Sequence, residues 1–117
     1  MDDIFYMSTK NIEIRDIDEI ARRINVKNTF IPQSKDILTV EYCDGVIAQW
    51  FCMSPEEFRE SEDMRFLTEH KIKSIFCIAH HQYHFSFISP HLKLLLQEYG
   101  GWIGSDEDGF QPLITLA

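Results

Sequence analysis

The spacing of apolar and polar residues predicts alternating strands and helices along the chain. Residues 3–8 form an apolar run typical of a short strand. A helix is predicted from Asp16, which can cap it, because Glu19 follows at the spacing of a capping box. The apolar face of this helix consists of Ile17, Ile20, Ala21 and Ile24. Asn25 is a suitable end for the helix, and residues 26–36 are expected to form a loop.

Two β-rich runs in the middle of the chain, residues 37–43 and 46–53, predict a β-hairpin. Asp44 and Gly45 join the two runs, and this dipeptide suits the positive φ angles of a two-residue type I′ turn. Such a turn places the last residue of the first strand opposite the first residue of the second. Opposed residues share a sheet face, so the turn also determines which residues of the hairpin lie on each face.

One predicted face of the hairpin is apolar, and we assign it to the core. It carries Leu38, Val40, Tyr42, Ile47 and Phe51, with Gln49 as its exception. The other face is mixed and carries Thr39, Glu41, Ala48 and Trp50, with Ile37 and Cys52 at its end. Trp50 has two interpretations there. It is either an exposed interface anchor or a residue that packs beneath the helix near the C-terminus.

The second half of the chain continues with helix-start signals. Ser54 followed by Pro55 opens a helix that runs to about His70, with a break near Ser61. Residues 72–79 are typical of a strand, which residues 82–88 extend or follow with another.

A second cap-plus-proline pair opens the last helix. Ser89 and Pro90 start it, and Gly100 ends it. Its buried stripe comprises Leu92, Leu95, Leu96 and Tyr99. A short Trp102-Ile103 segment, an acidic turn over residues 105–109 and a last strand near residues 113–116 complete the chain.

The predicted element order defines the fold class. The order up to residue 80 is β-α-β-β-α-β, which matches a ferredoxin-like α+β core. A C-terminal helix and short strands are appended to it. Residues 1–117 are expected to form a single domain, since 117 residues is an ordinary length for one domain.

Charge and cysteine content narrow the function classes. The formal net charge is −8, so binding to nucleic acid or to an anionic membrane is disfavoured, and a basic protein partner is favoured. Met1-Asp2-Asp3 does not resemble a signal peptide, which favours a cytoplasmic location. The odd number of cysteines indicates free thiols, which we expect to be buried, in the reducing interior of a cell.

The sequence contains no catalytic signature and no cofactor-binding motif. His80, His81 and His84 are a candidate metal site or catalytic cluster. On a continuous strand, however, His80 and His84 would lie roughly 13 Å apart, and only a sharp turn at Gln82 would gather the rings. Cys77 beside these histidines would suggest a thiol nucleophile, but no orienting carboxylate is evident near it.

The acidic turn over residues 105–109 resembles part of a calcium loop. It lacks the further acidic ligands of an EF-hand, including the last glutamate. We therefore expect a solvated turn rather than a cation site.

The C-terminal stretch resembles the ending of small bacterial immunity-type proteins, which pair with polymorphic toxins and block them. The resemblance lies in residues 94–104, where Leu-rich helix sequence ends in Gly100-Gly101 and leads to Trp102, and in Asp106, Asp108, Gly109 and Pro112. It covers about a fifth of the chain. It implies a cytoplasmic, non-enzymatic binder and assigns no catalytic residue.

Together these features predict a non-enzymatic bacterial protein-binding domain, with no metal or cofactor. The expected contact residues are Trp50, Glu41, Asp106, Asp108 and Trp102. The alternatives are a small metal protein or enzyme that uses His80, His81 and His84, and a homodimer formed through the face that carries Trp50.

Overall fold

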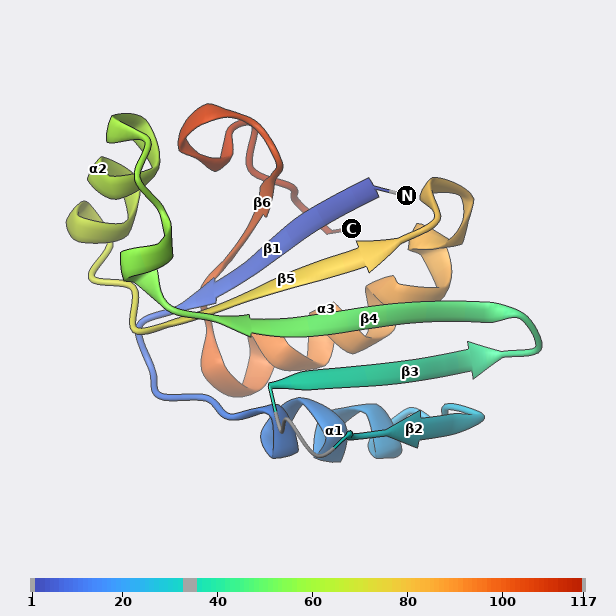
Figure 1. Cartoon of the computed structure of the whole chain (residues 1–117). Coiled ribbons are helices and arrows are strands. Elements are labelled where there is room, and N and C mark those ends of the chain that lie inside the picture. The colour runs from blue at the N-terminus through green and yellow to red at the C-terminus, as the bar shows by residue number, and fades with distance from the viewer. Residues whose placement is uncertain (1, 33–35, 117) are drawn as a thin grey trace.

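The computed structural model describes residues 2–32 and 36–116, and one antiparallel sheet organises them (Figure 1). The sheet has six strands in the order β2-β3-β4-β5-β1-β6. Their bounds are β1 Asp2–Ser8, β2 Asn28–Phe30, β3 Ile37–Cys43, β4 Val46–Met53, β5 Ser74–His80 and β6 Trp102–Ser105.

Three α-helices and three 3₁₀ turns connect these strands. The α-helices are α1 Ile14–Arg23, α2 Ser61–Glu69 and α3 Phe85–Tyr99. The 3₁₀ turns are η1 Pro55–Glu57, η2 Gln82–His84 and η3 Asp108–Phe110. No helix within the described ranges has both the length and the apolar character needed to cross a membrane.

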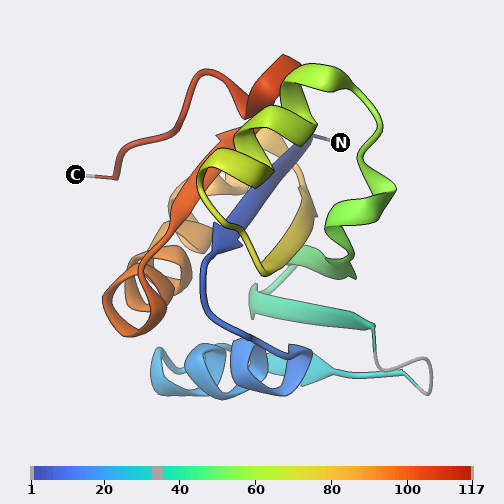
Figure 2. The same ribbon diagram turned by 90° about the vertical axis from the view of Figure 1, so that its left-hand side faces the viewer.

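The helices cover the two faces of the sheet unequally (Figures 1 and 2). α1 and α3 pack on one face, and their apolar side chains share a single buried cluster with residues of five strands. α2 and η3 pack on the opposite face, over β1 and β5. That second cluster includes no residue of β2 or β3, so the outward side of these two strands is left without a helix.

The α+β class is confirmed, but the ferredoxin-like strand order is not. β5 lies between β4 and β1, and every neighbouring pair of strands is antiparallel. Up to residue 80, the predicted order of strands and α-helices along the chain is correct apart from β2. That strand lies within the segment expected to be a loop, of which residues 33–35 are outside the described residues.

The first helix begins one turn earlier than the sequence pattern predicts. Glu13 is its N-cap residue, and the Glu13 backbone N–H donates to the Asp16 carboxylate at 2.8 Å. Asp16 therefore occupies the third helical position of the capping motif rather than the N-cap position predicted for it. Ile14 extends the buried face by one residue, which explains the earlier start.

The last helix also begins earlier than predicted, and residues 82–88 are not a strand. The chain turns through η2 and enters α3 at Phe85, so Pro90 lies inside the helix. A proline there removes one backbone hydrogen bond. Ile88 is fully buried and continues the apolar stripe of Leu92 and Leu95, and its burial offsets that loss.

Two further predictions concern the segments around α2 and the C-terminus. The predicted break at Ser61 is confirmed, because η1 and α2 are separate elements. The predicted strand at residues 113–116 is wrong. Leu113 forms only an isolated bridge with Gly104, and the Ile114 N–H donates to the Ile103 carbonyl at 2.8 Å.

The hairpin forms as predicted, but its register differs. Gly45 has a φ of 76°, whereas Asp44 is not among the described residues with positive φ, so the turn is not type I′. The register shifts between Glu41 and Cys43, where Tyr42 is the extra residue of a β-bulge. Because one inserted residue reverses the pairing parity, the inward and outward sides of β4 are exchanged relative to the prediction.

Candidate protein-binding surface

The exchanged parity of β4 places Trp50 in the interior, which corrects the exposed position predicted for it. The Trp50 side chain has an exposed fraction of 0%. Its ring lies beneath α3, with its centroid 4.6 Å from that of the His91 ring. Trp50 is therefore unavailable as a contact residue. Of the two interpretations of Trp50 that the sequence allowed, the one in which it packs beneath the C-terminal helix is correct.

The Trp50 indole belongs to a network of hydrogen-bonded, buried polar groups. The Trp50 indole N–H donates to the Tyr42 hydroxyl at 3.2 Å, and that hydroxyl lies 2.8 Å from His91 Nδ1. His91 Nε2 lies 2.9 Å from the Ile17 carbonyl oxygen, which can only accept. The His91 proton therefore resides on Nε2, and the Tyr42 hydroxyl donates to Nδ1. Each polar group of this network thus has a hydrogen-bond partner.

Burial sets the protonation state of this network. Desolvation lowers the pKa of His91 to about 4, although the hydrogen bond to Ile17 and the charge of Asp18 act in the opposite direction. Burial likewise raises the pKa of the Tyr42 hydroxyl. Both groups are neutral at physiological pH, as expected for polar side chains that hold a core together rather than carry out chemistry.

The outward side of β2, β3 and β4 and the adjoining part of β5 form the uncovered surface that we call the open face. Strand pairing brings its residues into register, from Phe30 through Thr39 and Gln49 to Ala79. None of its side chains is fully buried, and the most exposed apolar ones are Phe30, at 63%, and Ile47, at 43%. The open face comprises Asn28, Phe30, Ile37, Thr39, Glu41, Ile47, Gln49, Phe51 and Ala79, and Cys77 lies at its border with the cluster beneath α2.

Carboxylates gather at the β1 end of the open face. Asp3 is paired with Ala79 across β1 and β5. The pKa of Asp106 is raised, first by desolvation and then by the charges of Asp3, Glu107 and Asp63. Asp106 is therefore close enough to the other three carboxylates to be repelled by them, and a basic partner would relieve that repulsion. Asp108 is exposed on the same acidic turn.

Glu41 lies at the opposite end of the open face, near the hairpin turn. Its carboxylate accepts from the Gly45 N–H at 3.3 Å and lies 3.9 Å from the Lys27 ammonium. Lys27 also contacts Asp44. Glu41 is thus partly engaged by its own chain, and Asp3 and Asp106 carry more of the unpaired negative charge.

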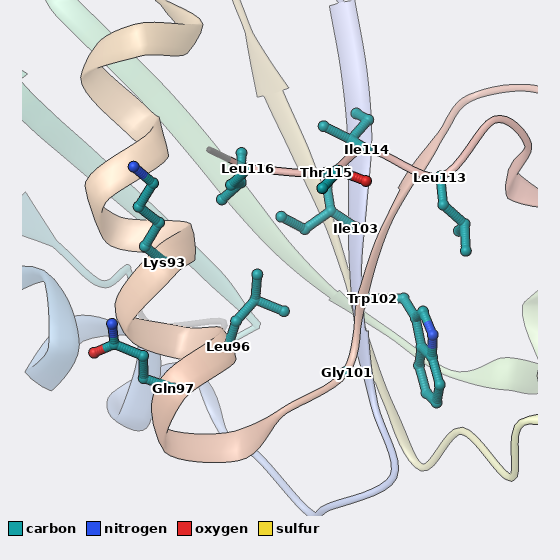
Figure 3. A pocket seen from close by; sticks show the side chains of 10 residues that line it. All are labelled: Lys93, Leu96, Gln97, Gly101, Trp102, Ile103, Leu113, Ile114, Thr115 and Leu116. Carbon is teal, nitrogen blue, oxygen red and sulfur yellow. The ribbon is translucent and has the colours of Figure 1, made fainter.

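Trp102 lies on the covered part of the sheet. Its ring packs edge-on against His70 and Phe66, with centroid distances of 4.8 and 6.3 Å. Figure 3 shows the Trp102 side chain on the opposite side of β6 from Leu96 and Leu116. Because Phe66 and His70 belong to α2 and its C-cap, Trp102 anchors that helix and does not adjoin Glu41.

The histidine cluster is divided between the core and the surface. His80 is buried, with an exposed fraction of 3%, and its Nδ1 lies 3.3 Å from the Ile78 carbonyl. The turn at η2 brings the rings of His81 and His84 to a centroid distance of 5.1 Å. Residues 2–32 and 36–116 contain no group of three or more His, Cys, Asp or Glu side chains placed to hold one metal ion.

The three cysteines are free, but the expectation that all are buried is wrong. Cys52 is exposed, and Cys43 and Cys77 are half-buried. Desolvation, followed by the charges of Asp3 and Asp106, raises the pKa of Cys77 to about 12. The Cys77 thiol is protonated at neutral pH, and this disfavours a role as a nucleophile.

Sequence reasoning missed Phe30 and Ile47 of the open face, and Asp3, which adjoins it. Phe30 was assigned to a loop, and Ile47 to the core. Gln49, the exception on the face assigned to the core, was the available signal for the correct side of β4, because it is the one strongly polar residue between Val46 and Met53. Comparison of the chain with family models, curated proteins and solved structures finds no match in any of the three.

Proposed function

We propose that this chain is a non-enzymatic bacterial protein-binding domain that holds a basic protein partner against its open face. The observation that carries the proposal is the uneven covering of the sheet. On one face, helices pack against five of the six strands, whereas the other face leaves β2 and β3 without a helix and exposes Phe30 and Ile47. Phe30 adjoins the half-buried pair of Ile37 and Phe51, and apolar side chains grouped in this way within a polar surround are typical of protein interaction sites.

The distribution of charge supports a basic partner. The open face carries Glu41 at one end and adjoins Asp3 and Asp106 at the other, in a chain of net charge −8. Complementary charge accelerates association and rejects acidic competitors, while the exposed apolar side chains supply affinity. Asp106 and Asp108 remain proposed contacts, and Phe30 and Ile47 take the place of Trp50 as anchors.

The proposed partner is a toxin, and the domain would act as an immunity-type protein that occludes it. The support is the C-terminal resemblance, whose residues fold as the end of α3, β6 and the acidic turn beside Asp3. Occlusion requires only a stable complementary surface. It needs neither a nucleophile nor a metal ion, which agrees with a protonated Cys77.

Co-expression with the product of the adjacent gene tests the proposal. The adjacent product is expected to be toxic when expressed alone, to lose toxicity when this chain is present, and to co-purify with it less efficiently as salt rises. A harmless neighbour, or one that binds no better than an unrelated acidic protein, would contradict the proposed role. Sedimentation of the chain alone distinguishes a second copy from a foreign partner on the open face.

A further inference from the structure

A second surface feature, independent of the proposed function, is a groove between η1 and α2 with a volume of about 660 Å³. Leu67 and Ile72 form its floor and are nearly buried, with exposed fractions of 5% and 7%. Phe58 and Met64 form apolar walls, and Met64 is 51% exposed. The volume falls within the range of small-molecule sites, and the lining leads directly to the second apolar cluster.

The rim of the groove is cationic, although the chain as a whole is strongly acidic. Arg59, Lys71 and Lys73 line it and are exposed. None of the three forms an ion pair within residues 2–32 and 36–116, whereas the cations of α1 pair with carboxylates. The one acidic residue of the lining, Glu56, is engaged by the Ser54 hydroxyl, which lowers the Glu56 pKa.

We infer that this groove binds an aliphatic chain that ends in a carboxylate, as in a medium-chain fatty acid. The apolar chain would lie on Leu67 and Ile72 and displace water from them. The carboxylate would lie at the rim, where Lys71 and Lys73 have charge to neutralise and no competing partner. A neutral alcohol would lose the charge contact, and a cationic amphiphile would meet three like charges.

Calorimetric titration of the full chain with sodium decanoate, below its micelle concentration, tests the inference. We expect saturable one-to-one binding, with decanol and decyltrimethylammonium at least tenfold weaker. The double variant Lys71→Glu/Lys73→Glu is expected to weaken decanoate binding at least tenfold. The matched control Lys10→Glu/Lys93→Glu makes the same change in net charge at exposed lysines outside the groove, and binding should stay within twofold of wild type.

Three results would overturn the inference. One is equal weakening by the two double variants, which would indicate a general charge effect. Another is decanol binding as tightly as decanoate. The third is tighter binding of a short peptide with a free leucine carboxyl terminus, which would make the ligand a protein end instead of a small molecule. Circular dichroism spectra that match wild type show that the variants are folded.

Discussion

Tyr42 is the residue on which the interior polar network depends. Its hydroxyl accepts from Trp50 and donates to His91, so it satisfies two buried groups at once. Removing the hydroxyl would leave the indole N–H and the imidazole Nδ1 without partners in a dry site. An unsatisfied buried polar group costs more than an ordinary hydrogen bond contributes.

Tyr42→Phe should therefore lower the free energy of unfolding by about 1–3 kcal/mol. Urea denaturation followed by tryptophan fluorescence measures this change. Tyr83→Phe is the matched control, because Tyr83 is 76% exposed and its hydroxyl has no partner in the described part of the chain. A Tyr42→Phe protein as stable as the control would show that the network does not contribute to stability.

His91 should make the stability of the fold depend on pH. Its pKa is lowered from 6.5 to about 4 in the folded chain, so the unfolded chain binds a proton first as the pH falls. The stability contributed by the neutral ring is complete above pH 6.5 and is lost progressively as the pH falls to about 4. The loss should reach about 3 kcal/mol.

Urea denaturation at a series of pH values measures this dependence. Wild type and His91→Gln are compared at each pH, because the carboxylates titrate equally in both proteins. The wild type should lose more stability than the variant between pH 6.5 and 4. Parallel curves would mean that the His91 ring does not resist protonation.

At the scale of elements, the junction between α3 and β6 depends on two adjacent glycines with positive φ, 66° at Gly100 and 108° at Gly101. A Cβ at Gly100 would meet open space, whereas one at Gly101 would collide with the carbonyl oxygen of Met7. Gly101 therefore allows β6 to approach β1 closely at the start of their pairing.

The two glycines give a matched pair of variants. Gly100→Ala should cost about 1 kcal/mol through backbone conformation alone. Gly101→Ala should cost at least about 3 kcal/mol, because β6 must move away from β1 as well. Thermal or urea unfolding of the two proteins measures the difference, and equal destabilisation would mean that β6 is not held against Met7.

The elements also show which parts of the fold the sequence could predict. Helical spacing located α1 and the latter part of α3, and the Ser-Pro signal with the break at Ser61 separated η1 from α2. The bulge at Tyr42 could not be predicted from Asp44-Gly45, because the same dipeptide suits more than one turn type. Only contacts between distant segments, such as those of Trp50 with His91, select the register of the hairpin.

The candidate site was harder to predict than the fold. Asp106 and Asp108 were identified by charge and are exposed, while Trp50 was placed on the wrong side of β4 by a shift of one residue. Asp3 could not be identified, because its position beside Asp106 depends on the order of β5, β1 and β6. The spacing of residues along the sequence does not indicate which strands become neighbours in the sheet.

At the scale of the whole molecule, the sheet separates two kinds of surface. α1 and α3 close one side around the Trp50 network, and the other side is divided between α2 with its cationic groove and the open face with its acidic end. The two outer surfaces carry opposite charge and would attract different ligands. The proposed function depends on the open face being the surface that holds a protein partner.

Calorimetric titration of the adjacent gene product with Ile47→Arg and Phe87→Arg tests this claim most directly. Ile47 and Phe87 are similarly exposed, at 43% and 47%, but Ile47 lies on the open face and Phe87 on α3. Ile47→Arg should weaken binding of a basic partner at least tenfold, or about 1.4 kcal/mol, while Phe87→Arg should bind like wild type. Undiminished binding by Ile47→Arg, or a loss confined to Phe87→Arg, would contradict the account.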